Sequence, residues 1–235
     1  MKKIALMMMA LAATLSFVSC DSAETEYATN VDYATVVGTM PVTLVTDSNQ
    51  TLIVADCATE IGTYSPAYGQ RALIYYTPLQ TADSKTSTYV NVKLYGYMHF
   101  DDSETAILSP GEETDYGQYE VDIYRDYTGA YYLVHATKKV LDMVIVSTGT
   151  PEKLSDHGYT LVLDEDEPVV DGYLNLTLAH ETSEAETKTY VMTPRTFDLS
   201  SALFAHYIEG TNGLRITTKG ISSENPVVHQ FTWAN

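Results

Sequence analysis

The sequence predicts an all-β protein in which a small closed barrel is followed by an antiparallel β-sandwich. Two observations support this prediction: a strand-like period of two along most of the chain, and a composition of 19 tyrosines with abundant valine and threonine. No stretch has the pattern of a long amphipathic helix. Short strands without intervening helices favour antiparallel barrels or sandwiches over a parallel sheet.

The clearest strand is expected at residues 89–100, where apolar and polar positions alternate without a break. Further strands are expected at 34–37, 42–45, 51–55, 71–77, 119–124, 131–136, 141–147, 159–163, 173–179, 187–192, 214–218 and 227–233. Turn signals such as Asp171-Gly172 separate them. One short helix is expected at 199–207, with Asp198 or Ser200 as its N-cap.

The strand pattern breaks between residues 103 and 117, where Pro110-Gly111 is followed by a run of acids. This break predicts a barrel domain at residues 31–109, a linker at 110–116 and a β-sandwich domain at 117–235. The first segment has the size of a small closed barrel such as an OB-fold. The second suits a sandwich of roughly seven to nine strands.

Residues 1–19 have the features of a secretory signal peptide, namely a lysine pair, an apolar run and a small residue before Cys20. The run is shorter than the roughly 20 apolar residues that span a bilayer. The string Leu15-Ser16-Phe17-Val18-Ser19-Cys20 resembles the lipobox of bacterial lipoproteins, although Phe17 stands where leucine is usual. The resemblance implies that Cys20 receives a diacylglyceryl group, becomes the mature N-terminus and attaches the protein to a membrane. The alternative is an ordinary secretory signal with a chance cysteine.

Residues 20–30 are expected to form an acidic tether, because Asp21, Glu24 and Glu26 follow the cysteine without apolar periodicity. The segment resembles the acidic tails that direct lipoproteins of the Bacteroidetes type to the outer face of the outer membrane. We therefore expect a lipid anchor in the outer membrane, with the protein at the cell surface. The usual tail is denser in acids, so the periplasmic face is the alternative.

The chain is strongly acidic, with a formal charge of −18. Removal of residues 1–19 takes away Lys2 and Lys3 and makes the balance more negative still. Such a charge repels nucleic acid and anionic lipid headgroups, so no nucleic-acid partner is expected. It favours solubility and cationic partners, and an acidic surface without a specific cation is the simpler interpretation.

Residues with chemical potential are scattered along the sequence. None of the six histidines lies within ten residues of another, and they are His99, His135, His157, His180, His206 and His229. A zinc-binding helix needs two histidines four residues apart, and neither a GxSxG motif nor a glycine-rich phosphate loop is present. We therefore predict no catalytic, cofactor-binding or metal-binding residues and no cofactor. Cys57 follows an apolar run beside Asp56, which favours a buried, inert thiol.

Two local concentrations of residues have competing interpretations. Asp164-Glu165-Asp166-Glu167 is the densest acidic run, but its spacing does not match a calcium loop, and a solvated turn is favoured. Six tyrosines crowd a stretch around Thr128-Gly129: Tyr116, Tyr119, Tyr124, Tyr127, Tyr131 and Tyr132. Their rings could stack on sugars or fill a protein interface, although cross-strand packing is favoured.

Several segments together resemble the NigD-like lipoprotein family of Bacteroidetes. They are Gly69 to Tyr76, Tyr89 to Leu94, Ala106 to Leu108, Asp171 to Leu176 and the final strand ending at Trp233. The resemblance covers most of the chain after Cys20, and the segment beginning Asp171-Gly172 carries most of its specificity. It implies an OB-like barrel followed by a β-sandwich, and no established catalytic residues.

Taken with the anchor at Cys20, the resemblance implies a non-enzymatic envelope lipoprotein. Such a protein acts as a binding or interaction module at the outer membrane, with a protein or glycan partner. The first alternative is a bacteriocin-associated immunity or accessory protein, because the family takes its name from a bacteriocin gene neighbourhood. The second alternative is an enzyme whose site is assembled from distant residues.

Overall fold

The protein is all-β, as the sequence predicts, in a computed structural model that describes residues 28–79, 89–112, 119–125, 132–135, 139–184, 189–221 and 223–233. The strands are β1 (Asn30–Thr39), β2 (Val42–Thr46), β3 (Thr51–Cys57), β4 (Arg71–Pro78), β5 (Tyr89–Leu108), β6 (Val121–Ile123), β7 (Tyr132–His135), β8 (Val140–Thr148), β9 (His157–Asp164), β10 (Val169–Val170), β11 (Tyr173–Thr182), β12 (Tyr190–Asp198), β13 (Gly213–Thr218) and β14 (Val227–Thr232). The helical elements are η1 (Thr59–Ile61), η2 (Pro151–Asp156) and α2 (Ala202–Ile208). The predicted signal peptide and Cys20 lie outside the described residues.

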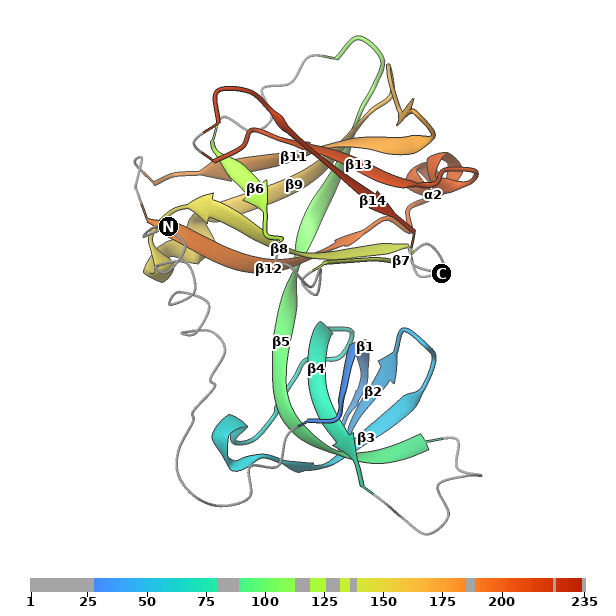
Figure 1. Cartoon of the computed structure of the whole chain (residues 1–235), viewed down its shortest axis with the longest axis vertical. Helices are drawn as coiled ribbons and strands as arrows, with labels where there is room; N and C mark the ends of the chain where they lie inside the picture. Colours follow the sequence, from blue (N-terminus) through green and yellow to red (C-terminus); the bar gives the residue numbers. More distant parts are fainter. Residues whose placement is uncertain are drawn as a thin grey trace. The chain divides into compact units, whose positions relative to one another are not determined.

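The chain divides into two compact units, Met1–Asp101 and Asp102–Asn235. In the first unit the strand order is β5-β3-β2-β1-β4, and β4 also pairs with β5, so that the sheet closes into a barrel (Figure 1). The β3–β5 pair is parallel and the other pairs of the barrel are antiparallel. Closure leaves this sheet without an edge and encloses a core of small and branched apolar side chains, including Val36, Leu44 and Leu52. The predicted OB-like barrel is confirmed.

Strand β5 belongs to both units. Its first part pairs with β3 and β4 in the barrel, and Glu104–Leu108 then pair in parallel with β9 of the second unit. The units therefore meet between Asp101 and Asp102, within a strand, whereas the sequence pattern put residues 102–109 in the barrel domain and the break at 110–116. The pattern ends at Phe100 because acids follow it, yet backbone pairing continues through them. That each unit folds by itself remains a prediction.

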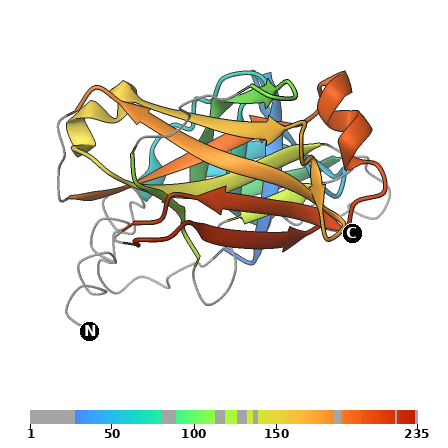
Figure 2. The same cartoon turned by 90° about the horizontal axis from the view of Figure 1, so that it is seen from above.

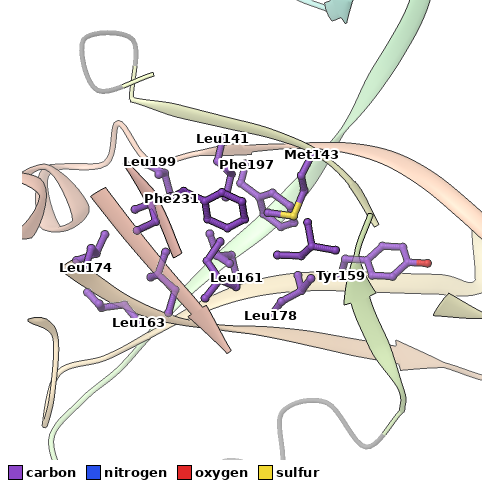
Figure 3. Packing of buried hydrophobic residues seen from close by; sticks show 14 of the residues in the cluster. Leu141, Met143, Tyr159, Leu161, Leu163, Leu174, Leu178, Phe197, Leu199 and Phe231 are labelled. Atoms are coloured by element: carbon purple, nitrogen blue, oxygen red, sulfur yellow. The ribbon is translucent and has the colours of Figure 1, made fainter. Parts of the chain in front are cut away.

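The second unit packs two groups of strands around one core (Figures 1 and 2). One group is β8 with β12 on one side and the short strands β6 and β7 on the other. The other group is built around β11, which pairs with β9, β10 and β13, and β13 in turn pairs with β14. Figure 3 shows side chains from β8, β9, β11, β12 and β14 meeting between them, with Phe197 and Phe231 near the centre.

Two details of the second unit differ from the sequence expectation. The β11–β13 pair is parallel, because the chain passes through β12 and α2 between these strands and re-enters the group in the same direction. Helix α2 is present, but its N-cap is Ser201, whose Oγ accepts a hydrogen bond from the Phe204 amide at 3.4 Å. Asp198 instead caps a turn, where its carboxylate accepts from the Ser200 amide at 2.7 Å.

Strand β14 shows how the alternating pattern orients the site described below. His229 and Phe231 are buried, whereas Val228, Gln230 and Thr232 face solvent. The buried residues pair with Leu214 and Ile216 of β13. The last strand therefore has the partner that its sequence requires, and it carries a histidine into the interior.

Candidate functional site

The structure brings two of the scattered histidines into direct contact inside the second unit. Strands β9 and β11 run antiparallel with Thr182 opposite His157 and His180 opposite Tyr159. This register places both imidazoles on the same face, where His157 Nδ1 lies 2.9 Å from His180 Nε2. Both residues are buried, with 5% and 0% of their surfaces exposed. Their separation in sequence hid this contact.

Glu184 lies at one end of the histidine pair. Its Oε2 is 3.0 Å from His157 Nε2 and accepts a hydrogen bond from the Thr150 amide at 2.9 Å. Lys153 of η2 approaches the other carboxylate oxygen to 3.5 Å, and its side chain is largely exposed. The hydrogen bonds from His157 and Thr150 lower the pKa of Glu184 to about 2, so the carboxylate is ionised at physiological pH.

Gly149 makes room for the contact between His157 and Glu184. A Cβ atom at this position would lie 2.4 Å from His157 Cε1 and 3.3 Å from a Glu184 carboxylate oxygen. Any larger residue would therefore displace the His157 ring. Glycine is required here by the approach of a side chain and not by backbone conformation.

The segment before β6 lies at the other end of the pair. His180 Nδ1 is 3.1 Å from the Glu120 carbonyl oxygen, and the Tyr119 ring packs edge-on against His180 at 5.8 Å between centroids. Tyr159 stacks on the His180 ring at 5.0 Å, and its hydroxyl lies 2.8 Å from Ser147 Oγ. Burial, together with the neighbouring His157, lowers the pKa of His180 to about 4.

A second histidine contact holds the same short strand. His229 Nε2 lies 2.7 Å from Asp122 Oδ1, and Thr218 Oγ1 lies 3.4 Å from the same oxygen. Burial opposes ionisation of Asp122, but the hydrogen bonds from His229 and the Ile123 amide outweigh it and lower the pKa of the carboxyl group. Residues 120–122 are thus attached to β11 through His180 and to β14 through His229.

The other candidate residues have simpler surroundings. His99 stacks on Tyr64 in the barrel, and His206 is exposed on α2. Cys57 is half-buried against the barrel core, less enclosed than its sequence suggests. In the acidic turn, Asp166 accepts a hydrogen bond from the Gly111 amide at 2.9 Å. Three members of the tyrosine group, Tyr116, Tyr127 and Tyr131, lie outside the described residues.

Chemically, the cluster resembles a proton relay more than a metal centre. The 2.9 Å gap between the two imidazole nitrogens matches an N–H···N hydrogen bond. A zinc ion takes about 2.0 to 2.1 Å from each nitrogen and normally needs at least three protein ligands. Within the described part of the chain, no group of three or more His, Cys, Asp or Glu side chains is placed to hold a metal ion.

The barrel has a different kind of feature, the exposed apolar side chains of Val37, Met40 and Tyr68 near the C-terminal end of β1. Met40 occupies the β1–β2 turn and is 90% exposed, and Tyr68 is 76% exposed. The loop that carries Tyr68 is joined to β1 by a hydrogen bond from the Gly69 amide to the Val36 carbonyl at 2.8 Å. Tyr68 therefore lies at the same end of the barrel as the turn, next to Val37, which is 40% exposed.

Comparison with known families identifies the barrel. Residues 33–95 match the model of the NigD-like N-terminal OB domain. The barrel of the first unit is thus similar to the NigD-like N-terminal OB domain. The resemblance predicted from the sequence is thereby confirmed, and the matched segment covers most of β1, all of β2 to β4 and the first part of β5. No curated protein matches the chain.

Solved structures share the fold of nearly the whole chain. A protein of unknown function from Bacteroides vulgatus aligns with a TM-score of 0.64 at 18% identity, over 88% of this chain and 91% of its own. A candidate lipoprotein from Bacteroides fragilis aligns with a TM-score of 0.62 at 16% identity, over 87% and 98%. A NigD-like immunity protein from Bacteroides caccae aligns with a TM-score of 0.52 at 16% identity, over 88% and 99%. At these identities the likeness concerns the fold.

Proposed function

We propose that this protein is a lipid-anchored envelope protein that binds a protein partner through the apolar end of its NigD-like OB domain and performs no catalysis. The observation that carries the proposal is the exposure of Met40 and Tyr68 at one end of a closed barrel. Large apolar side chains gathered on a surface mark interaction sites, and methionine and tyrosine adapt well to protein surfaces.

The position of this end relative to the proposed anchor favours a protein over a lipid surface. Strand β1 begins at Asn30, ten residues after Cys20, and runs to Thr39, which adjoins Met40. A strand of this length spans roughly 30 Å at about 3.3 Å per residue. Met40 therefore lies at the end of β1 far from the tether. The acidic composition, which repels anionic headgroups, supports the same choice.

The anchor itself supports placement in the envelope. A cysteine after a secretory signal, an acidic tether and the fold shared with a candidate lipoprotein are consistent with attachment through Cys20 to the outer membrane. No helix among the described residues is long and apolar enough to cross a membrane. Exposure at the cell surface is the favoured orientation, and the periplasmic face is the alternative.

The anchor is tested by Cys20→Ala. This variant should move from the membrane fraction to the soluble fraction, because lipid chains supply the attachment. Protease added to intact cells should digest the unmodified protein if it lies on the cell surface. Detergent partitioning that is the same for Cys20→Ala and the unmodified protein would refute lipid attachment, and digestion only after the outer membrane is opened would place the protein in the periplasm.

The partner is tested by a photo-crosslinking amino acid placed at position 40 in cells, with position 228 as the control. Val228 is also an exposed apolar residue, 48% exposed, but lies on β14 of the other unit. We expect a discrete protein adduct at 40 and none at 228. Tyr68→Ser should weaken binding of the purified partner at least tenfold. Adducts with lipid or glycan alone, or equal adducts at both positions, would overturn the proposal.

A role in immunity is the second candidate. The fold shared with a NigD-like immunity protein over 88% of this chain favours it. In that case the crosslinked partner should be a toxin or its target, and deleting the gene should sensitise cells to that toxin. Resistance to the toxin restored by Cys20→Ala as fully as by the unmodified gene would separate the immunity role from anchoring.

A further inference from the structure

The contacts of the buried histidine cluster determine how many protons it needs for all of them to be hydrogen bonds. Three polar contacts run in series: Glu184 to His157, His157 to His180, and His180 to the Glu120 carbonyl oxygen. Both ends of this series are acceptors, since the carboxylate is ionised and a carbonyl has no proton to give. Each contact needs one proton to be a hydrogen bond. Two neutral imidazoles supply only two.

Each proton count gives a different state of the series. With two protons, one of the three contacts brings two lone pairs together in a buried place, which is costly. With three protons, all three contacts are hydrogen bonds, and the positive charge of the histidine pair is balanced by Glu184. With four protons, two N–H groups face each other across 2.9 Å. The three-proton state is the one that this geometry satisfies.

We propose that the His157–His180 pair is a proton-binding switch that holds one extra proton, and that this proton fastens Tyr119 and Glu120 to β11. When the extra proton is lost at higher pH, one of the three contacts no longer has a proton to form its hydrogen bond. The segment before β6 is then held less tightly. Burial and the neighbouring His157 lower the pKa of His180 to about 4, which fits a pair that avoids the four-proton state.

The groups around the pair supply a charge environment for this switch. Glu184 faces His157 directly and favours the extra proton, and Lys153 at 3.5 Å from Glu184 partly offsets it. Tyr159 stacks on His180. The guanidinium of Arg195, a residue of β12, lies 5.3 Å from the centroid of the Tyr159 ring. The Tyr119 ring covers His180 from the β6 side. Glu184 is the anion closest to the pair among these groups, so it should set the pH of the switch.

The short strand has a second attachment that localises the movement. Asp122 is held by His229 at 2.7 Å, and the Val121 carbonyl accepts a hydrogen bond from the Gly220 amide at 3.0 Å. These contacts do not depend on the His157–His180 proton. Loosening should therefore affect residues 119–120 first, while residue 122 stays attached.

Two measurements on the full chain test the proposal. Nitrogen NMR of the imidazole rings should show the pair losing one proton in a single step that both rings report. Amide hydrogen exchange of residues 119 and 120, corrected for intrinsic rates, should show protection falling by up to tenfold per pH unit above that step, whereas residue 122 should keep its protection. Independent titration of the two rings, or protection that does not change with pH between 5 and 9, would overturn the proposal.

Variants separate the switch from a merely structural role. Glu184→Gln keeps an oxygen that can accept from His157 but removes the charge, so the step should move to lower pH. His180→Asn keeps a donor near the Glu120 carbonyl oxygen and should abolish the pH dependence of protection. His206→Asn, at an exposed position on α2, is the matched control and should change neither readout.

A step unmoved by Glu184→Gln would also overturn the proposal, and this variant retains the volume needed for folding. Protection restored at high pH by added zinc chloride would instead assign the pair to a metal.

Discussion

The two units of the protein differ in where their most distinctive polar and apolar groups lie. In the OB domain, apolar side chains reach solvent at Met40 and Tyr68, and the buried polar chemistry at the β1–β4 seam is an ion pair between Arg71 and Asp47. In the C-terminal unit, large rings such as Phe197 are enclosed, and a chain of titratable groups is buried with them. The OB domain is therefore suited to binding at its surface, and the C-terminal unit to responding to pH from within.

The first prediction concerns the core of the C-terminal unit, where the largest effect is expected. Phe197→Ala should lower the free energy of unfolding by about 3 to 5 kcal/mol, because a fully buried ring leaves a cavity. The chain has one tryptophan, Trp233, in the C-terminal unit, so its fluorescence reports that unit. Denaturant unfolding followed at Trp233 measures the loss.

The matched control is Leu44→Ala in the core of the OB domain. It should destabilise the barrel by about 2 to 5 kcal/mol, seen by circular dichroism, and leave the Trp233 transition in place. If Leu44→Ala shifted the Trp233 transition as much as Phe197→Ala does, the two units would unfold as one, and the proposed domain division would be refuted.

The second prediction concerns the buried ion pair of the OB domain. Arg71 Nη1 and Nη2 donate to the two Asp47 carboxylate oxygens at 2.7 and 2.9 Å, and Arg71 is 6% exposed. Arg71→Met should cost about 3 kcal/mol, because it leaves a largely buried carboxylate without its cation. Circular dichroism of the barrel transition checks the loss. The double variant Arg71→Met with Asp47→Leu should recover part of this loss. A double variant that loses more free energy of unfolding than the two single variants together would contradict the ion-pair account.

The strands and the short helix could be predicted from the sequence because they depend on local alternation and turn signals. Each expected strand overlaps an observed one, and α2 lies one to three residues from its expected bounds. The parallel pairs β3–β5 and β11–β13 could not be predicted from the sequence, since pairing between strands that are distant in sequence leaves no local signal. The short strand β10 has only two residues, Val169 and Val170, which is too few to show an alternating pattern. The continuation of β5 past Asp101 was missed because acids interrupt its apolar alternation.

The candidate sites were less accessible to sequence analysis. His157 and His180 meet only because of the β9–β11 register, which a pattern of alternation within each strand does not specify. A weak signal existed, since His157 lies two residues before the predicted strand at 159–163 and His180 lies directly after the predicted strand at 173–179. The exposure of Met40 could not be predicted either, because an apolar residue beside a proline in a turn can be covered by other parts of the protein or exposed, and the local sequence does not distinguish the two.

The third prediction concerns acid stability and separates the two units by pH. The pKa of His180 is about 4 in the folded protein against about 6.5 in the unfolded chain. Between these values the unfolded chain binds more protons, so stability present above pH 6.5 should be lost as the pH falls toward 4. The loss should approach about 3 kcal/mol, at about 1.36 kcal/mol per pKa unit.

Unfolding at a series of pH values, followed at Trp233, measures this loss. The His180→Asn variant should show a flatter profile over the same window. Glu184 acts in a separate window, because its stabilising ionisation is present above its ordinary pKa and is lost only as the pH falls toward about 2. A wild-type profile that is flat from pH 6.5 to 4 would contradict the burial of a neutral His180.

The fourth prediction is the smallest and concerns how the last strand is fastened. Trp233 follows β14 directly, packs partly against the core, and its indole N–H donates to the Thr211 carbonyl oxygen at 2.9 Å. The sequence placed Trp233 inside the final strand, whereas its anchorage is this bond to the segment after α2. Trp233→Phe keeps most of the ring and removes the donor, so it should cost about 1 kcal/mol, the worth of one neutral hydrogen bond.

Because this variant lacks the fluorophore, its unfolding must be followed by circular dichroism. Val228→Thr, at an exposed position, is the control and is expected within about 0.5 kcal/mol of the unmodified protein. A loss above 3 kcal/mol would mean that the ring, and not its hydrogen bond, fastens the strand.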